Sequence, residues 1–102
     1  MYLGQVFKLC RDYSGKRQMV FCRELGISQT YMSQLEKGRR ECGWGLVNKA
    51  VEVSGLNWVV VAWVLGSNGD GDRYAIMDAL LGGAYGVRIV RVNGVVERVE
   101  KV

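Results

Sequence analysis

The sequence predicts a mostly helical protein that ends in a β-hairpin, and three observations lead to this fold class. Along most of the chain, apolar residues recur at three- and four-residue spacings, as on the buried face of a helix. Glycines, 14 in number, divide the chain into short helical segments, whereas proline is absent. Near the C-terminus, valine-rich runs flank an Asn-Gly pair, a strong hairpin signal. We therefore expect five helices, a short extra helix and a hairpin.

The first predicted helix spans about residues 2–13 and ends at Ser14-Gly15. Its apolar residues follow the spacing of one helix face: Leu3, Val6, Phe7 and Cys10. Tyr13 extends this apolar face toward the end of the helix. A second helical pattern over residues 19–25 stops at Gly26, because glycine readily adopts the left-handed conformation that ends many helices.

The third predicted helix follows the second after a very short connection. Ser28 is a favourable N-cap, and residues 29–36 place Met32 and Leu35 on one face before Gly38 ends the helix. Two short helices joined by Gly-Ile-Ser form a specific arrangement.

A Gly-rich hinge over residues 42–45 leads to a fourth predicted helix over 46–53. The next apolar segment, 58–65, is ambiguous. Its consecutive valines favour a strand by propensity, whereas the short helices before it favour a buried fifth helix. We predict the helix.

Residues 66–72 are predicted to form a flexible polar linker. Asn68, Asp70 and Asp72 have the spacing of a calcium loop, but Arg73 stands where that loop requires glycine, so no metal site is predicted. A short helix follows over 73–81, with Asp72 as a candidate N-cap and Gly82-Gly83 as its stop.

Two registers remain open for the hairpin. A two-residue loop at Asn93-Gly94 pairs Val92 with Val95 but sets Val90 against Glu97. A three-residue loop gives other pairs: Arg91 with Glu97, Ile89 with Val99, and Arg88 with Glu100. Because a lone hairpin is marginal in water, this one must pack on the domain or pair with another chain.

Composition and charge limit the classes of function that the protein can have. A length of 102 residues suits one domain, or one small domain with an appendage. Histidine is absent, which excludes His-based acid–base catalysis, Ser-His and Cys-His pairs, and His-containing metal sites. Residues 1–40 carry eight Lys and Arg against three Asp and Glu, whereas residues 41–102 carry six against seven. A basic half joined to a neutral half is typical of a polyanion-binding unit with an added element.

The cysteines and apolar runs indicate the compartment. Cys10, Cys22 and Cys42 are odd in number and form no C-x-x-C pair, so neither a disulfide framework nor a zinc site is expected. The N-terminus lacks the features of a signal peptide, and the longest apolar run, 58–65, is too short to span a bilayer. We expect a cytoplasmic protein without a membrane segment.

The segment 18–38 carries a recognisable pattern. Gln18 opens it, the bulky-small pair Phe21-Cys22 follows, residues 25–28 form a Leu-Gly-Ile-Ser turn, and a Ser-x-x-Glu-x-Gly pattern ends at Gly38. This pattern resembles the helix-turn-helix of lambda-type repressors, Cro proteins and their XRE-like bacterial relatives. Five residues of the pattern are expected to point inward and fix the angle between the helices: Phe21, Leu25, Ile27, Met32 and Leu35.

The resemblance covers about residues 2–66 and ends near Trp63 and Gly66, which implies a five-helix, lambda-repressor-like fold. We therefore expect a helix-turn-helix DNA-binding domain over 1–66. Residues 67–102 would then supply a linker, a short helix and a hairpin that serve dimerisation by analogy with Cro-type proteins.

The resemblance also implies residue roles. The segment 28–36 would be the recognition helix in the major groove of double-stranded DNA, with Gln29 reading adenine N6 and N7. Gln18 would contact phosphate and brace Gln29. Further candidates for base or phosphate contacts are Thr30, Tyr31, Ser33 and Gln34, and the candidates for phosphate contacts after the helix are Lys37, Arg39 and Arg40. Arg11 and Glu36 occupy positions of an ion pair that ties the first helix to the third.

One departure concerns Lys16 and Arg17, which stand where relatives carry an apolar residue and a Ser or Thr cap. We expect the second helix to start earlier here, capped by Ser14, which would add both cations near the DNA backbone.

The predicted function is a sequence-specific DNA-binding transcriptional regulator, a repressor acting as a homodimer on a pseudo-palindromic operator. No catalysis, metal or cofactor is implied. The alternative is a protein-interaction module, an antitoxin-like or inhibitor protein whose C-terminal hairpin binds a protein partner while DNA binding serves autoregulation.

Overall fold

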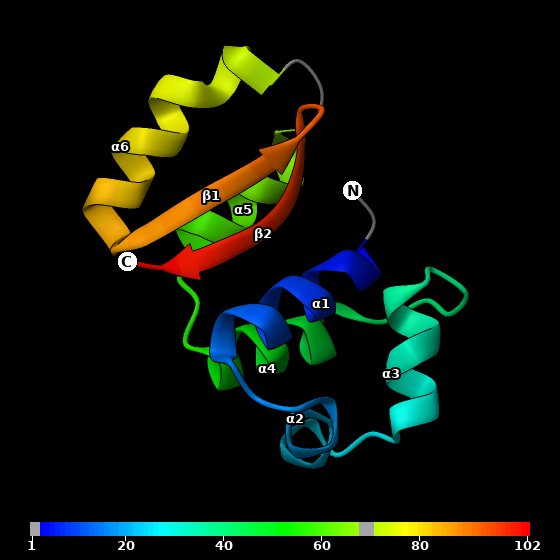
Figure 1. Cartoon of the computed structure of the whole chain (residues 1–102). Coiled ribbons are helices and arrows are strands. Elements are labelled where there is room, and N and C mark those ends of the chain that lie inside the picture. Colours follow the sequence, from blue (N-terminus) through cyan, green and yellow to red (C-terminus); the bar gives the residue numbers. More distant parts are fainter. Residues whose placement is uncertain (1–2, 68–70) are drawn as a thin grey trace. The chain divides into compact units, whose positions relative to one another are not determined.

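The computed structural model describes residues 3–67 and 71–102 and contains two compact units, Met1–Leu56 and Asn57–Val102 (Figure 1). The described part is mostly helical and ends in a two-stranded antiparallel hairpin, as the sequence predicts. None of the helices in it is long and apolar enough to cross a membrane.

The first unit contains α1 (Leu3–Ser14), α2 (Gln18–Leu25), α3 (Gln29–Glu36) and α4 (Trp44–Ser54). Helices α1 and α2 each pack against both α3 and α4. Burial of apolar side chains is the main force that holds these short helices together, since helices of this length are marginal alone. The core of this unit consists of Val6, Phe7, Leu9, Cys10, Phe21, Cys22, Leu25, Met32, Leu35, Val47, Ala50, Val51 and Leu56. The inward positions predicted in α2 and α3 are thus confirmed, except that Ile27 is only half-buried.

The connection between α1 and α2 corrects the predicted start of the second helix. Ser14 is the last residue of α1, and its hydroxyl donates to the Arg11 carbonyl and accepts from the Lys16 N–H, at 2.7 and 3.1 Å. Gly15 has a φ of +70° and turns the chain. Arg17 is extended at the N-cap position of α2, without a side-chain cap, so Ser14 does not cap this helix.

The turn and third helix match their sequence signals closely. Gly26 ends α2 in the left-handed conformation, and the Ser28 hydroxyl accepts from the Tyr31 N–H at 3.1 Å to cap α3. Gly38, with a φ of +71°, follows the end of α3.

Helix α4 starts earlier than predicted. The hinge assigned to residues 42–45 is shorter, because Trp44 and Gly45 already belong to α4 and Gly43 occupies its N-cap. Trp44 is nevertheless exposed.

An ion pair links α1 to α3. The Arg11 guanidinium lies 3.1 Å from a Glu36 carboxylate oxygen, and both side chains are mostly buried. The pair expected from the resemblance is therefore confirmed. Burial raises the pKa of the Glu36 carboxyl above its ordinary value, and the Arg11 charge only partly offsets this. The cost of desolvating the Glu36 carboxylate therefore exceeds the stabilisation that the Arg11 charge supplies.

The second unit contains α5 (Trp58–Gly66), the 3-10 helix η1 (Gly71–Tyr74), α6 (Ala75–Tyr85), and strands β1 (Val87–Val92) and β2 (Val95–Lys101). The helix predicted over 58–65 is confirmed, and the Asn57 side chain caps it by accepting from the Val59 N–H at 2.8 Å. The contacts within the chain group α5 with the second unit, whereas the sequence analysis places this helix in the domain over residues 1–66. The domain boundary at residue 66 stays a prediction. The predicted linker and calcium-like spacing include residues 68–70, which lie outside the described residues.

Helix α6 runs through the predicted stop at Gly82-Gly83 and ends at Gly86, whose φ is +65°. Glycine at position 82 also permits a close approach between α6 and β1. A Cβ atom at Gly82 would overlap the carbonyl oxygen of Val87, so glycine here lets α6 contact the start of β1. The N-cap position is occupied by Tyr74 rather than Asp72, which corrects the predicted start.

The hairpin combines part of each predicted register, but Glu97 pairs with neither Val90 nor Arg91, and Arg91 pairs with Val96. Asn93 and Gly94 form the two-residue turn with φ of 52° and 81°, and Val92 pairs with Val95. Beyond Arg91 the register shifts, because Glu97 is an extra residue in β2 that forms a bulge. The remaining pairs are Val90 with Arg98, Ile89 with Val99, Arg88 with Glu100, and Val87 with Lys101.

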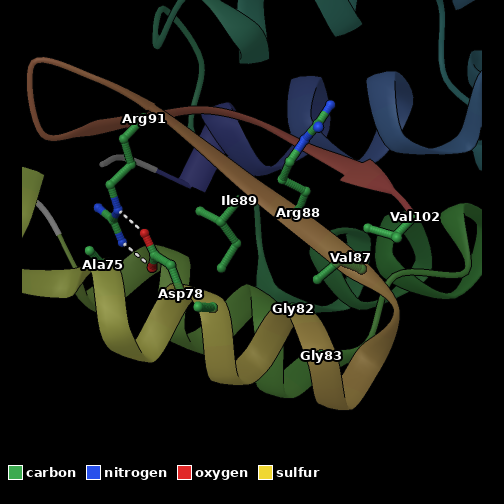
Figure 2. Close-up of a pocket in the computed structure, with 10 residues that line it drawn as sticks. Ala75, Asp78, Gly82, Gly83, Val87, Arg88, Ile89, Arg91 and Val102 are labelled. Atoms are coloured by element: carbon green, nitrogen blue, oxygen red, sulfur yellow. Dashed lines mark hydrogen bonds and ion pairs between the residues drawn. The ribbon is translucent and has the colours of Figure 1, made fainter.

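The bulge has a clear packing consequence. In a regular strand, residues three apart face opposite sides of the sheet. The extra residue Glu97 instead lets Val96 and Val99 lie on the same face, and both are buried. Val87 and Ile89 share this face and point toward α6 (Figure 2).

Arg91 ties together the elements of the second unit. Its guanidinium makes two hydrogen bonds to the Asp78 carboxylate, at 2.6 and 3.0 Å, and also donates to Ser67 and to the Gly94 carbonyl (Figure 2). The Trp63 indole N–H donates to the same carboxylate at 2.8 Å. The group therefore connects α5, α6, β1 and the hairpin turn.

Electrostatics favours the ionised form of this group. Burial disfavours ionisation of Asp78, but the hydrogen bonds from Arg91 and Trp63 outweigh it and lower the pKa of the carboxyl. Tyr74 completes the cluster, since its ring lies 4.9 Å from the Arg91 guanidinium carbon and packs edge-on against Trp63.

The three cysteines are free thiols, as their spacing predicts. Cys10 and Cys22 belong to the core of the first unit, whereas Cys42 is half-buried. Burial raises the pKa of Cys10 to about 11, with a hydrogen bond to Ser54 opposing part of the shift. Burial also raises the pKa of Cys22 and of Cys42. All three thiols are therefore protonated at neutral pH.

The Arg11–Glu36 pair predicts an asymmetry between two substitutions. Arg11→Met leaves a mostly buried carboxylate without its cation and should lower the free energy of unfolding by about 3–5 kcal/mol. Glu36→Gln removes the carboxylate and its desolvation cost while keeping an oxygen that can accept from Arg11, whose side chain is also the more exposed of the two, so it should change that free energy by less than about 1.5 kcal/mol. Urea unfolding followed by circular dichroism at neutral pH measures both. Equal losses in the two variants would contradict this account.

The same pair has a pH signature. Because the pKa of Glu36 is higher in the folded than in the unfolded chain, the folded chain holds this proton more tightly. The wild type should therefore gain stability relative to Glu36→Gln as the pH falls from neutral toward the ordinary value of 4.5.

Asp78→Ala should destabilise the second unit by about 3–5 kcal/mol, because it leaves the buried Arg91 charge without its carboxylate. Amide hydrogen exchange should show the loss of protection concentrated in α6, β1 and β2. Arg88→Ala is the matched control, since it breaks the exposed Arg88–Glu100 pair and should cost about 1 kcal/mol or less. Similar losses in both variants would mean that burial of the Arg91 pair contributes nothing.

Candidate nucleic-acid interface

The outer face of α3 is polar and uncharged. Gln29 and Thr30 are exposed on its first turn, and three further side chains are half-buried at the surface: Tyr31, Ser33 and Gln34. The charged residue of this helix, Glu36, pairs with Arg11. The outer face thus presents amides and hydroxyls, which can both donate and accept hydrogen bonds, without a carboxylate that would repel phosphate.

The start of α2 lies against the middle of α3. The Gln18 amide nitrogen is 3.5 Å from the Ser33 hydroxyl, which places the first turn of α2 beside the outer face of α3. Arg17 directly precedes this turn and is exposed.

Lys16 has a structural contact instead of a free position near DNA. Its ammonium lies 2.6 Å from the Glu24 carboxylate and 3.5 Å from the Val53 carbonyl of α4. Lys16 is thus half-buried and paired, whereas Arg17 is exposed; the expectation that both cations lie near the DNA backbone stays a prediction.

The basic loop after α3 folds back onto the end of the helix. The Gly38 N–H donates to the Leu35 carbonyl, and the Arg39 N–H donates to the Gln34 carbonyl at 2.9 Å. These bonds satisfy carbonyls at the helix end and hold the loop in place. Lys37, Arg39 and Arg40 are all exposed there.

Arg40 contacts the outer face of α3. Its Nε donates to the Gln34 side-chain carbonyl at 3.1 Å, and its guanidinium carbon lies 5.7 Å from the centre of the Tyr31 ring. The sequence predicts neither contact, because the family resemblance gives Arg40 the role of contacting a DNA phosphate. The path of the loop decides them, and residue spacing alone carries no signal of that path.

The structure therefore brings most of the predicted site residues to one region. The contacts join Gln18 to Ser33 and Arg40 to both Tyr31 and Gln34. Gln29 and Thr30 lie exposed at the start of the same helix, and Lys37 and Arg39 lie exposed beyond its end. What each residue touches on DNA stays a prediction.

A groove in the second unit is a weaker candidate site. It has a volume of about 520 Å³ between α6 and β1, and small residues on α6 leave it open (Figure 2). Its charged residues already have partners, because Arg91 pairs with Asp78 and Arg88 with Glu100. The groove offers few polar groups for orienting a ligand.

Comparison with known proteins agrees with the geometry of the first unit. A family model described as a helix-turn-helix domain matches residues 2–63. No curated protein and no solved structure matches the chain. The family match includes α1 to α4 and most of α5, and it covers more than half of the 102 residues. The protein therefore belongs to the helix-turn-helix family of DNA-binding domains.

Proposed function

We propose that the protein is a sequence-specific transcriptional regulator, a cytoplasmic repressor that occludes a promoter by binding its operator. The observation that carries this proposal is the uncharged polar face of α3, bordered by exposed Arg17, Lys37 and Arg39. An α-helix with its side chains is about as wide as the major groove, so α3 can enter it. The flanking cations would then meet phosphates. The proposal assigns the protein no catalytic step, metal or cofactor.

We further propose that the active form is a homodimer on a pseudo-palindromic operator. Support comes from α6, whose charged residue Asp78 is paired with Arg91 while its apolar side chains face outward. Ile76 is 77% exposed and Leu80, one turn later, is 61% exposed. Val92 and Val95 add exposed apolar surface at the hairpin turn. A two-fold dimer would present two α3 helices about 34 Å apart, one turn of DNA.

The second candidate function uses the same apolar surface. In that case α6 and the hairpin would bind a different protein, as in an antitoxin-like or inhibitor protein, and DNA binding would serve autoregulation. The two candidates differ in the oligomeric state that they predict for the isolated chain.

The DNA-reading role of α3 predicts distinct effects for two substitutions. Gln29→Ala should cost about 1–3 kcal/mol of binding free energy at one base position and relax the preference there. Lys37→Met should weaken binding almost uniformly across sequences and reduce the salt slope by about one per protomer. Fluorescence anisotropy measures both effects, with each variant titrated at several salt concentrations into a duplex selected from a random pool. An equal loss for Gln29→Ala on selected and random DNA would make Gln29 a structural residue.

The dimer predicts that a charge on α6 dissociates the protein. Ile76→Glu and Leu80→Glu should each weaken self-association at least about tenfold, because burial of one such side chain contributes about 1.5–3 kcal/mol. Sedimentation velocity measures the change. Met19→Glu, also at an exposed apolar residue but on α2, is the control and should leave the dimer intact. A wild-type chain that stays monomeric at micromolar concentration would favour the heterologous partner.

A further inference from the structure

Gln34 is held in one orientation by Arg40. A guanidinium has only N–H donors, so the side-chain atom of Gln34 that faces Arg40 Nε at 3.1 Å must be the amide oxygen. The opposite end of the amide, its NH₂ group, then points away from Arg40. The contact thus decides which half of the amide is available to a ligand on the outer face of α3.

Two further interactions hold Arg40 in this position. Backbone hydrogen bonds from Gly38 and Arg39 close the loop onto the end of α3. The guanidinium also lies against the Tyr31 ring, at 5.7 Å from its centre, one helical turn before Gln34. The Tyr31 ring and the Gln34 oxygen thus both favour this position of the guanidinium.

This orientation limits what Gln34 can read. A free glutamine reads adenine through two bonds, with its oxygen accepting from N6 and its nitrogen donating to N7. The oxygen keeps a second lone pair, but the Arg40 cation beside it disfavours the approach of another N–H donor, so Gln34 presents mainly its NH₂ donors to a ligand. Guanine presents two adjacent acceptors, N7 and O6, in the major groove, whereas adenine presents a donor beside its acceptor.

We propose that Gln34 reads a guanine through its side-chain NH₂ group, and that Arg40 is the positioning residue that imposes this choice. The inference rests on the proposed DNA-binding function of α3. It assigns Arg40 a role in base preference, where its place in the sequence indicated a phosphate contact.

The test begins with selection of duplexes from a randomised DNA pool by the wild-type protein. Affinities are then measured for the selected duplex with each of the four base pairs at every position. We expect one position to prefer guanine in the wild type and to lose that preference in Gln34→Ala. In Arg40→Met the guanine-to-adenine affinity ratio at this position should fall about tenfold, because the freed amide can also bind adenine.

The matched control is Arg39→Met, the neighbouring exposed arginine. It should lower affinity for all sequences alike and leave the base preference unchanged. Arg40→Lys keeps a donor near the Gln34 oxygen and should retain part of the preference that Arg40→Met loses. Thermal unfolding of each variant checks that folding is intact, as expected for the exposed Arg39 and Arg40 and the half-buried Gln34.

The outcomes separate the two proposals. If the pool yields no enriched sequence, the proposed function fails and the inference falls with it. If sequences are enriched but Arg40→Met behaves like Arg39→Met, Arg40 is a phosphate contact and the inference alone is wrong. A guanine preference that survives Gln34→Ala overturns it equally.

Discussion

The Arg11–Glu36 pair is the interaction on which the uncharged outer face of α3 depends. Glu36 is the charged residue of α3, and the pair directs its carboxylate to α1 instead of the outer face. This has two effects at once: it links the first helix to the third, and it removes negative charge from the surface proposed to meet phosphate. Because burial raises the pKa of this carboxyl, the pair contributes more to the placement of the Glu36 carboxylate than to the free energy of unfolding.

The second unit has a small apolar core and therefore depends on other interactions for its stability. Its strands form a lone hairpin, which is marginal in water, and α6 has no fully buried side chain. The Arg91 group compensates by joining α5, α6, β1 and the turn through hydrogen bonds at one point. The Glu97 bulge adds to this by placing Val96 and Val99 on the same buried face.

These two units also show what could be predicted from sequence. Helix α3 was predicted residue for residue, because Ser28 and Gly38 mark its ends through local chemistry. Local signals failed at Gly82-Gly83: the pair predicts a helix stop, but α6 continues to Tyr85, and glycine at position 82 leaves room for the Val87 carbonyl. In the candidate site, the members were predicted from the pattern, but the Arg40–Gln34 contact depends on a loop path that no spacing encodes.

The charges divide between the units in a way that separates their roles. The first unit carries nine Lys and Arg against five Asp and Glu, whereas the second carries five of each. In the second unit Arg88, Arg91 and Arg98 all bind carboxylates, while Arg17, Lys37 and Arg39 are exposed in the first. The excess of positive charge thus lies in the first unit, which also carries α3, the helix proposed to read DNA. The second unit has no such excess of positive charge, and the exposed apolar side chains of α6 are the surface proposed to bind another protein chain.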